Sequence, residues 1–146
     1  MTNPASSLPA DPAAVLREAS EYSRYLAARI HARPELGEWL HARLDRPLNR
    51  NDLLDRLAAT PWQDEAGLLH ALRDLRQRVI CLLIARDLGG WADLAEVTRT
   101  CTELAEVCIR AACDWLHADL AAVYGEPLDA EGRPQRLIVV GMGKLG

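Results

Sequence analysis

Hydrophobic residues between positions 11 and 124 recur every three or four residues, which is the spacing that predicts amphipathic helices. Asp11 followed by Pro12 marks a helix start, because aspartate caps a first turn and proline suits the first helical position. The first predicted helix then presents one apolar face. That face consists of Val15, Ala19, Tyr22, Leu26 and Ile30.

Two shorter helices are predicted next. Arg33 and Pro34 interrupt the first helix, because the residue before a proline avoids helical conformations. The second helix covers about residues 34–44. After a loop, Asn51 or Asp52 can cap a third helix that ends before Thr60-Pro61.

Two long helices complete this region. The first begins near Asp64, has apolar residues that extend to more than one side, and stops at Gly89-Gly90. The second runs from about Trp91 to the region of Val123, and its apolar residues alternate steps of three and four, which is the seam of a helix packed lengthwise on another. The seam consists of Leu94, Val97, Cys101, Leu104, Cys108, Ala111 and Trp115. We therefore predict a helical bundle with a long antiparallel hairpin.

The pattern changes after residue 135. The continuous apolar run from Leu137 to Val140 is typical of a strand covered on both faces, yet the preceding residues offer no partner strand. We therefore expect a fragment cut inside its second domain. Its fold class is mainly α, with residues 1–10 a disordered leader, 11–124 a helical region, 125–135 a linker, and 136–146 the first strand and glycine loop of a truncated α/β domain.

Composition narrows the class of protein. Among 146 residues, 49% are hydrophobic and 26% are charged, as in ordinary globular domains. The net charge of −4 gives no basic face for nucleic acid. No apolar run approaches the roughly 18 residues that span a membrane, and residues 1–10 lack the pattern of a signal peptide. We predict a cytoplasmic protein with no membrane partner and with reduced cysteines.

Most polar candidates favour a structural role. The cysteines have no zinc-type spacing, and the histidines have no distinctive ligand spacing, so no metal site is predicted. Three arginines form a small basic cluster in which ion pairing is favoured over phosphate binding, and three acidic residues mark a solvated helix face. These candidates are Cys81, Cys101, Cys108, Cys113, His31, His41, His70, His117, Arg73, Arg76, Arg78, Glu103, Glu106 and Asp114.

The glycine-rich segment from Gly141 to Gly146 is the candidate binding site. Gly141, Gly143 and Gly146 allow positive φ angles and bring backbone N–H groups close to an anion, and Lys144 adds a positive charge. The spacing matches the dinucleotide pattern G-x-G-x-x-G but lacks its βαβ context, and it differs from a P-loop. The segment alone predicts a phosphate or nucleotide site, while a strand-to-helix turn that needs glycine only for geometry is the alternative.

Two segments carry a family resemblance. Residues 136–146, RLIVVGMGKLG, resemble the first strand and glycine loop of the glutamine synthetase adenylyltransferase/adenylyl-removing enzymes. Residues 85–113, with their RDLGG turn and LAEV segment, are similar to the helical segment that precedes this strand in that family. The first 60 or so residues match only loosely.

The resemblance implies an enzyme with two nucleotidyltransferase halves of the DNA polymerase β-like type. Met1 and the helical lead-in fit the N-terminal half, which removes AMP from a tyrosine of adenylylated glutamine synthetase by phosphorolysis and releases ADP. The other half attaches AMP from ATP. The PII signalling protein and glutamine regulate both activities, so the implied partners are glutamine synthetase and PII.

The implied cofactors are Mg²⁺ and ATP or ADP. In the family, carboxylates of an S-D-x-D segment downstream of the glycine loop hold two Mg²⁺ ions, and this chain lacks that segment. Of the family's active-site parts, this chain contains only the phosphate or nucleotide loop, which consists of Gly141, Gly143, Lys144 and Gly146. We therefore expect an inactive fragment without catalytic residues. The alternatives are a fragment of a dinucleotide-binding oxidoreductase and a non-catalytic helical interaction module.

Overall fold

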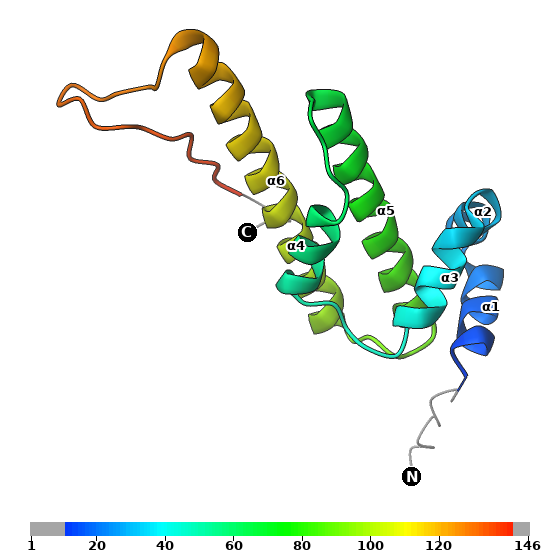
Figure 1. Cartoon of the computed structure of the whole chain (residues 1–146). Helices are drawn as coiled ribbons and strands as arrows, with labels where there is room; N and C mark the ends of the chain where they lie inside the picture. The colour runs from blue at the N-terminus through cyan, green and yellow to red at the C-terminus, as the bar shows by residue number, and fades with distance from the viewer. Residues whose placement is uncertain (1–10, 142–146) are drawn as a thin grey trace.

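The computed structural model describes residues 11–141, which form six α-helices and no β-strand (Figure 1). This part of the protein is mainly helical, as predicted. The helices are α1 (Pro12–Tyr22), α2 (Arg24–Ala32), α3 (Pro34–Arg43), α4 (Arg50–Ala58), α5 (Glu65–Leu88) and α6 (Leu94–Tyr124).

The predicted start of the first helix is confirmed, but the helix is shorter than expected. The Asp11 side chain accepts a hydrogen bond from the N–H of Ala13 at 3.0 Å. The prediction of one helix up to Arg33 is wrong because the backbone of Ser23 is extended and separates α1 from α2. The N–H of Ser23 donates to the carbonyl of Ala19 at the end of α1, and its hydroxyl accepts from the N–H of Leu26 at the start of α2. The break interrupts the predicted apolar face, and Tyr22 is 73% exposed.

Helix α4 begins earlier than the sequence pattern indicated. Its N-cap is Asn49 rather than Asn51 or Asp52. The Asn49 side chain accepts from the N–H groups of residues 51 and 52, and the Asp52 carboxylate accepts in return from the Asn49 N–H at 3.0 Å. This reciprocal capping box satisfies backbone donors that the helix itself leaves unpaired.

Helix α5 is the centre of the bundle, since it contacts all five other helices. Figure 1 shows α1 to α3 on one side of α5, and α4 and α6 on the other. Its predicted burial on more than one side is confirmed, and this burial explains why apolar residues occur around much of its circumference. Its buried apolar residues are Leu68, Ala71, Leu75, Val79, Cys81, Leu82, Leu83 and Ala85.

The turn after α5 depends on two glycines with different tasks. A Cβ atom on Gly89 would overlap Cγ1 of Val15, so glycine allows α1 to approach the end of α5. Gly90 has φ +69°, a left-handed conformation that glycine adopts without strain. From this turn α6 runs back in the opposite direction, with α4 in contact with both long helices (Figure 1).

Buried Arg86 fixes the start of α6. Its guanidinium donates to the Glu96 carboxylate at 2.7 and 3.0 Å and to the carbonyl of Trp91 at 3.1 Å. It also donates to the carbonyl of Leu44, just after α3. One side chain therefore joins the end of α3, the glycine turn and the first turn of α6.

Only the first half of helix α6 has side chains buried in the bundle. Thr100, Leu104 and Val107 are buried, whereas the predicted seam residue Leu94 is 78% exposed because it lies at the start of the helix beyond its neighbours. The far half of α6 diverges from α5 (Figure 1). The seam therefore packs over only part of the helix.

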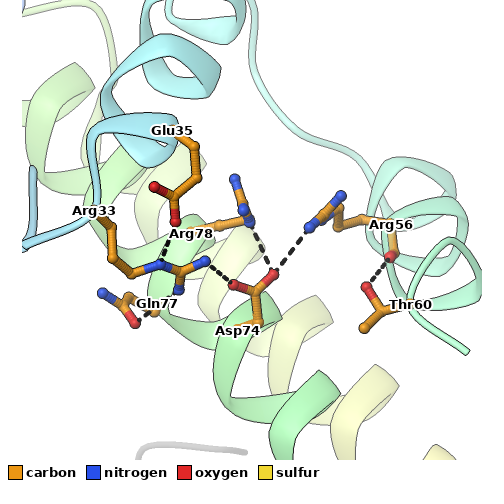
Figure 2. A network of polar contacts seen from close by, with 7 residues as sticks. All are labelled: Arg33, Glu35, Arg56, Thr60, Asp74, Gln77 and Arg78. Atoms are coloured by element: carbon orange, nitrogen blue, oxygen red, sulfur yellow. Dashed lines mark hydrogen bonds and ion pairs between the residues drawn. The ribbon is translucent and has the colours of Figure 1, made fainter. Parts of the chain in front are cut away.

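Asp74 on α5 holds three arginines from different parts of the chain (Figure 2). Its carboxylate accepts from Arg78 Nε at 2.8 Å and from Arg56 Nη2, on α4, at 3.0 Å. Arg33, between α2 and α3, places Nη2 2.7 Å from Oδ1 of the same carboxylate. Asp74 and Arg78 are each only 7% exposed, so the network lies inside the bundle.

The arginines keep the buried carboxylate ionised. Burial by itself raises the pKa of Asp74, but the hydrogen bonds from Arg78, Arg56 and Arg33 outweigh it and hold the pKa far below its usual range. The guanidinium of Arg78 also lies over the ring of Trp39 on α3, 5.5 Å from its centroid. The network thus connects α3, α4 and α5.

The chain after α6 is irregular. Gly125 ends the helix with φ +86°, and the Asp129 carboxylate then organises a turn by accepting from the N–H groups of Glu131 and Arg133. Residues 136–141 are extended and pair with no other part of residues 11–141, so the expected strand has no partner there. The expected leader at 1–10 and residues 142–146 of the glycine loop lie outside the described residues.

Replacing Asp74 with asparagine should lower the free energy of unfolding by roughly 2–4 kcal/mol, because Arg78 would then be a buried charge without a counter-ion. Urea denaturation followed by circular dichroism measures this change. Asp55→Asn is the matched control, since Asp55 is exposed on α4, and it should change stability by no more than about 0.5 kcal/mol. Equal stability of the two variants would contradict the role of Asp74.

The same network predicts a pH dependence. Because the pKa of Asp74 is lower in the folded state than in the unfolded chain, its stabilisation is present above the unfolded-state pKa of about 3.9 and is lost as the pH falls through the folded-state pKa. From about pH 5 downward, the wild type should therefore lose stability more steeply than Asp74→Asn. Parallel stability curves for the two proteins would refute the prediction.

Candidate functional site

A groove of about 810 Å³ lies between the middle of α6, the start of α4 and the extended residues 136–141. Gly141, the first residue of the predicted glycine loop, lines this groove. The other lining residues are Arg50, Thr102, Ala105, Glu106, Ile109, Arg110, Cys113, Asp114, Arg136, Leu137 and Val139. The candidate loop therefore begins beside α6 rather than away from the helical bundle.

The groove is lined by three arginines and two acidic residues, which form two ion pairs and leave one arginine over. Arg50 forms an ion pair with Glu106, and Arg136 Nη1 lies 3.2 Å from Asp114 Oδ1. Arg110 makes no ion pair within the described part of the chain. Both pairs are exposed to solvent, so each contributes little to stability and can exchange its partner for a ligand group.

Part of the groove lining is apolar. Ile109 of α6 faces the same space as Leu137 and Val139 of the extended segment. A groove with an apolar wall and charged margins suits a polypeptide or a ligand with an apolar part better than a free inorganic ion.

The predicted loop residues can be placed only in part. Gly141 is exposed at the groove, whereas Gly143, Lys144 and Gly146 lie outside residues 11–141. Their role as a phosphate or nucleotide loop stays a prediction. Within the described residues, no cluster of three or more histidine, cysteine, aspartate or glutamate side chains is arranged to hold a metal ion.

The sequence of this chain matches a known family over nearly its whole length. The profile of the glutamate-ammonia ligase adenylyltransferase family aligns with residues 13–146, which include α1 from its second residue, the whole of α2 to α6 and the predicted glycine loop. The chain belongs to this family.

Individual family members share close similarity with the chain. The bifunctional glutamine synthetase adenylyltransferase/adenylyl-removing enzyme of Aromatoleum aromaticum is 45% identical over 90% of the chain, and that of Thioalkalivibrio sulfidiphilus is 50% identical over 70%. The Nitrosomonas eutropha enzyme is 40% identical over the whole chain. The chain spans only 14%, 11% and 16% of these relatives, respectively. No solved structure matches the chain.

Three cysteines of this adenylyltransferase-family chain, Cys81, Cys101 and Cys108, lie in or against the hydrophobic core, in agreement with the structural role inferred from sequence. All four are free thiols. Burial raises the pKa of the Cys81 and Cys108 thiols, which suppresses the reactive thiolate. Cys113 lines the groove, which the sequence pattern did not indicate.

The predicted basic cluster is not one surface in this family member. Arg78 turns inward to Asp74, whereas Arg73 and Arg76 are exposed. Ion pairing, favoured from the sequence, is found for Arg78. None of residues 11–141 lies in a helix that is long and apolar enough to cross a membrane.

The cations of the groove have no local signal in the sequence. Arg50 is 56 residues from its partner Glu106, and Arg136 is 22 residues from Asp114. Both acidic residues are exposed, in agreement with the solvated helix face expected from the sequence, but no local spacing marks their distant partners. Only the fold brings these side chains together.

Proposed function

We propose that this chain is part of a bifunctional enzyme that controls glutamine synthetase, and thereby nitrogen assimilation, by adenylylation and deadenylylation. The observation that carries the proposal is the 45% identity over 90% of the chain to the Aromatoleum aromaticum enzyme, whose name states both activities. The relatives offer no support for a dinucleotide-binding oxidoreductase or a non-catalytic helical module.

Within this enzyme, we assign the chain to the adenylyl-removing half. In that reaction an oxygen of inorganic phosphate attacks the phosphorus of the adenylyl group, and the bond to the tyrosine oxygen breaks. ADP is formed, and the tyrosine hydroxyl is restored after protonation. The helical lead-in before the glycine loop fits the family's N-terminal half, as the resemblance implies.

The glycine loop would take part by binding phosphate oxygens. The glycines at 141, 143 and 146 have no side chain to keep an anion from the backbone N–H groups, and Lys144 can add a positive charge. Donors fixed in advance around developing negative charge lower the barrier of group transfer. Gly141 is exposed and lines the groove, so the loop begins where a ligand can approach it, which supports this assignment.

The domain division follows from the same proposal. Residues 11–124 form a helical region that precedes the catalytic domain, residues 125–135 link the two, and residues 136–146 begin a nucleotidyltransferase domain of the DNA polymerase β-like type. Exposure of 51–83% along Leu137 to Val140 supports this division, because an apolar strand of this kind needs cover from other strands.

The described residues do not fit the Mg²⁺ ions that the family implies, because they present no carboxylate cluster suited to a metal. We therefore derive no step through a metal here and assign its ligands to polypeptide outside this chain. ATP and ADP would be the nucleotides of the complete enzyme. Glutamine synthetase would be its substrate, the PII protein its regulator and the cytoplasm its compartment, where thiols stay reduced.

A chimera tests the function directly. In the Aromatoleum aromaticum enzyme, this chain replaces the matched region, and ADP release from adenylylated glutamine synthetase and phosphate is measured. Gly143→Val should slow the release about 100-fold, because a branched side chain keeps the phosphate from the loop N–H groups. Thermal unfolding of the helices should stay unchanged.

Met142→Val is the matched control, because it adds the same branched side chain at a neighbouring position that is not glycine. Its rate of ADP release should stay within a few-fold of the unmodified chimera. A Gly143→Val chimera that releases ADP at the unmodified rate would sink the role of the loop. An inactive unmodified chimera, with an active parent enzyme, would argue against the proposed function.

A further inference from the structure

Helix α6 carries a second apolar stripe besides the seam that packs in the bundle. Its members follow one another at steps of four, three, four and three residues, so they lie on one face of the helix. They are Ile109, Cys113, Leu116, Leu120 and Val123. At 3.6 residues per turn, this stripe is about a third of a turn away from the seam. A helix with two apolar faces is built to be covered on both.

The described residues cover only the beginning of the second stripe. Ile109 and Cys113 line the groove, whose other wall includes Leu137 and Val139. Farther along α6, Leu116, Leu120 and Val123 are 45%, 52% and 70% exposed. Figure 1 shows the chain after α6 running back toward the middle of this helix. The stripe and Leu137 to Val140 therefore form one surface, which we call the α6 platform.

The backbone of the platform indicates what kind of polypeptide covers it. Residues 136–141 make no backbone hydrogen bond to any other part of residues 11–141. Their peptide groups are open along both edges, and both faces of the run are apolar, as in the middle strand of a sheet. A helix cannot satisfy these groups, so the covering polypeptide must contribute β-strands.

Charge and chain length identify the source of these strands. Arg110 lies at the margin of the groove without an ion-pair partner in the described part of the chain, so the covering polypeptide needs a carboxylate at that point. In the relatives, more than four fifths of the polypeptide lies outside the region that this chain matches. A second copy offers no paired strand within residues 11–141, and pairing of two 137–140 segments would leave one edge of each open.

We propose that the α6 platform is the docking surface for the β-sheet of the catalytic domain, supplied by another part of the same enzyme. The sheet pairs with residues 137–140 and lays one face over Leu116, Leu120 and Val123. The proposal rests on the proposed function, because it takes the chain as part of a longer enzyme. Helix α6 then holds the catalytic domain in a fixed position relative to the bundle.

Hydrogen exchange of the Aromatoleum aromaticum chimera tests the platform. The amides of Ile138 to Val140 should be protected in the chimera, and the double substitution Leu120→Asp/Val123→Asp should speed their exchange at least about tenfold, because unpaired carboxylates oppose docking. In the 146-residue chain alone, where these side chains are exposed, the same double variant should keep its melting temperature and helicity. Leu120→Ala should produce a smaller change in the same direction if the double variant fails to fold.

Leu69→Asp is the matched control, because Leu69 is 42% exposed on α5 and lies outside the platform. It should leave exchange at Ile138 to Val140 unchanged. Equal exchange in the platform variants and the unmodified chimera would overturn the proposal. So would a dimer of the 146-residue chain that Leu120→Asp converts to monomer, since the occupant would then be a second copy.

The two proposals can fail separately. Release of ADP by the unmodified chimera reports the function, whereas exchange at residues 138–140 reports the platform. An inactive chimera with exchange that responds to the platform variants would support the surface and refute the function. An active chimera with exchange that does not respond would refute the surface alone.

Discussion

The buried carboxylate of Asp74 is the interaction on which the arrangement of the short helices depends. Helices α1 to α4 have only 9 to 11 residues each, a length at which an isolated helix is marginal in water. Apolar contacts with α5 stabilise them but permit small changes of register, whereas hydrogen bonds to one carboxylate are directional. By binding Arg33, Arg56 and Arg78 together, Asp74 sets where the α2–α3 junction and α4 sit on α5.

Local signals predicted the helices well where one residue decides the outcome. Asp11, Asp64 and Gly89 stand at the predicted ends because capping and close backbone approach are properties of single positions. The helix break at Ser23 was not predicted, because serine also occurs inside helices and its presence alone does not mark a cap. Within the Asp74 network, Arg78 has the local i,i+4 spacing of a helix ion pair, but Arg56 had no signal, since it is 18 residues away from Asp74.

The candidate site shows the same division between local and long-range information. The glycine loop stays a prediction, and it is one that the sequence can make, because its chemistry depends on the spacing of consecutive residues. The groove beside it could not, because its walls come from α4, α6 and the segment after residue 135. The second stripe of α6 is an intermediate case. Its spacing is visible in the sequence, but only the structure distinguishes it from the seam that the bundle covers.

The length of α6 makes the position of its far end sensitive to the packing of the bundle. At 1.5 Å per residue its 31 residues extend about 45 Å, so a tilt of about 10° at its first turn would move its far end by about 8 Å. Arg86 restrains that first turn through Glu96, and Asp74 keeps the neighbouring short helices in place. If the α6 platform seats the catalytic sheet, these buried ion pairs determine where the glycine loop meets its substrate. Polar groups far from the loop would then affect catalysis through the direction of one helix.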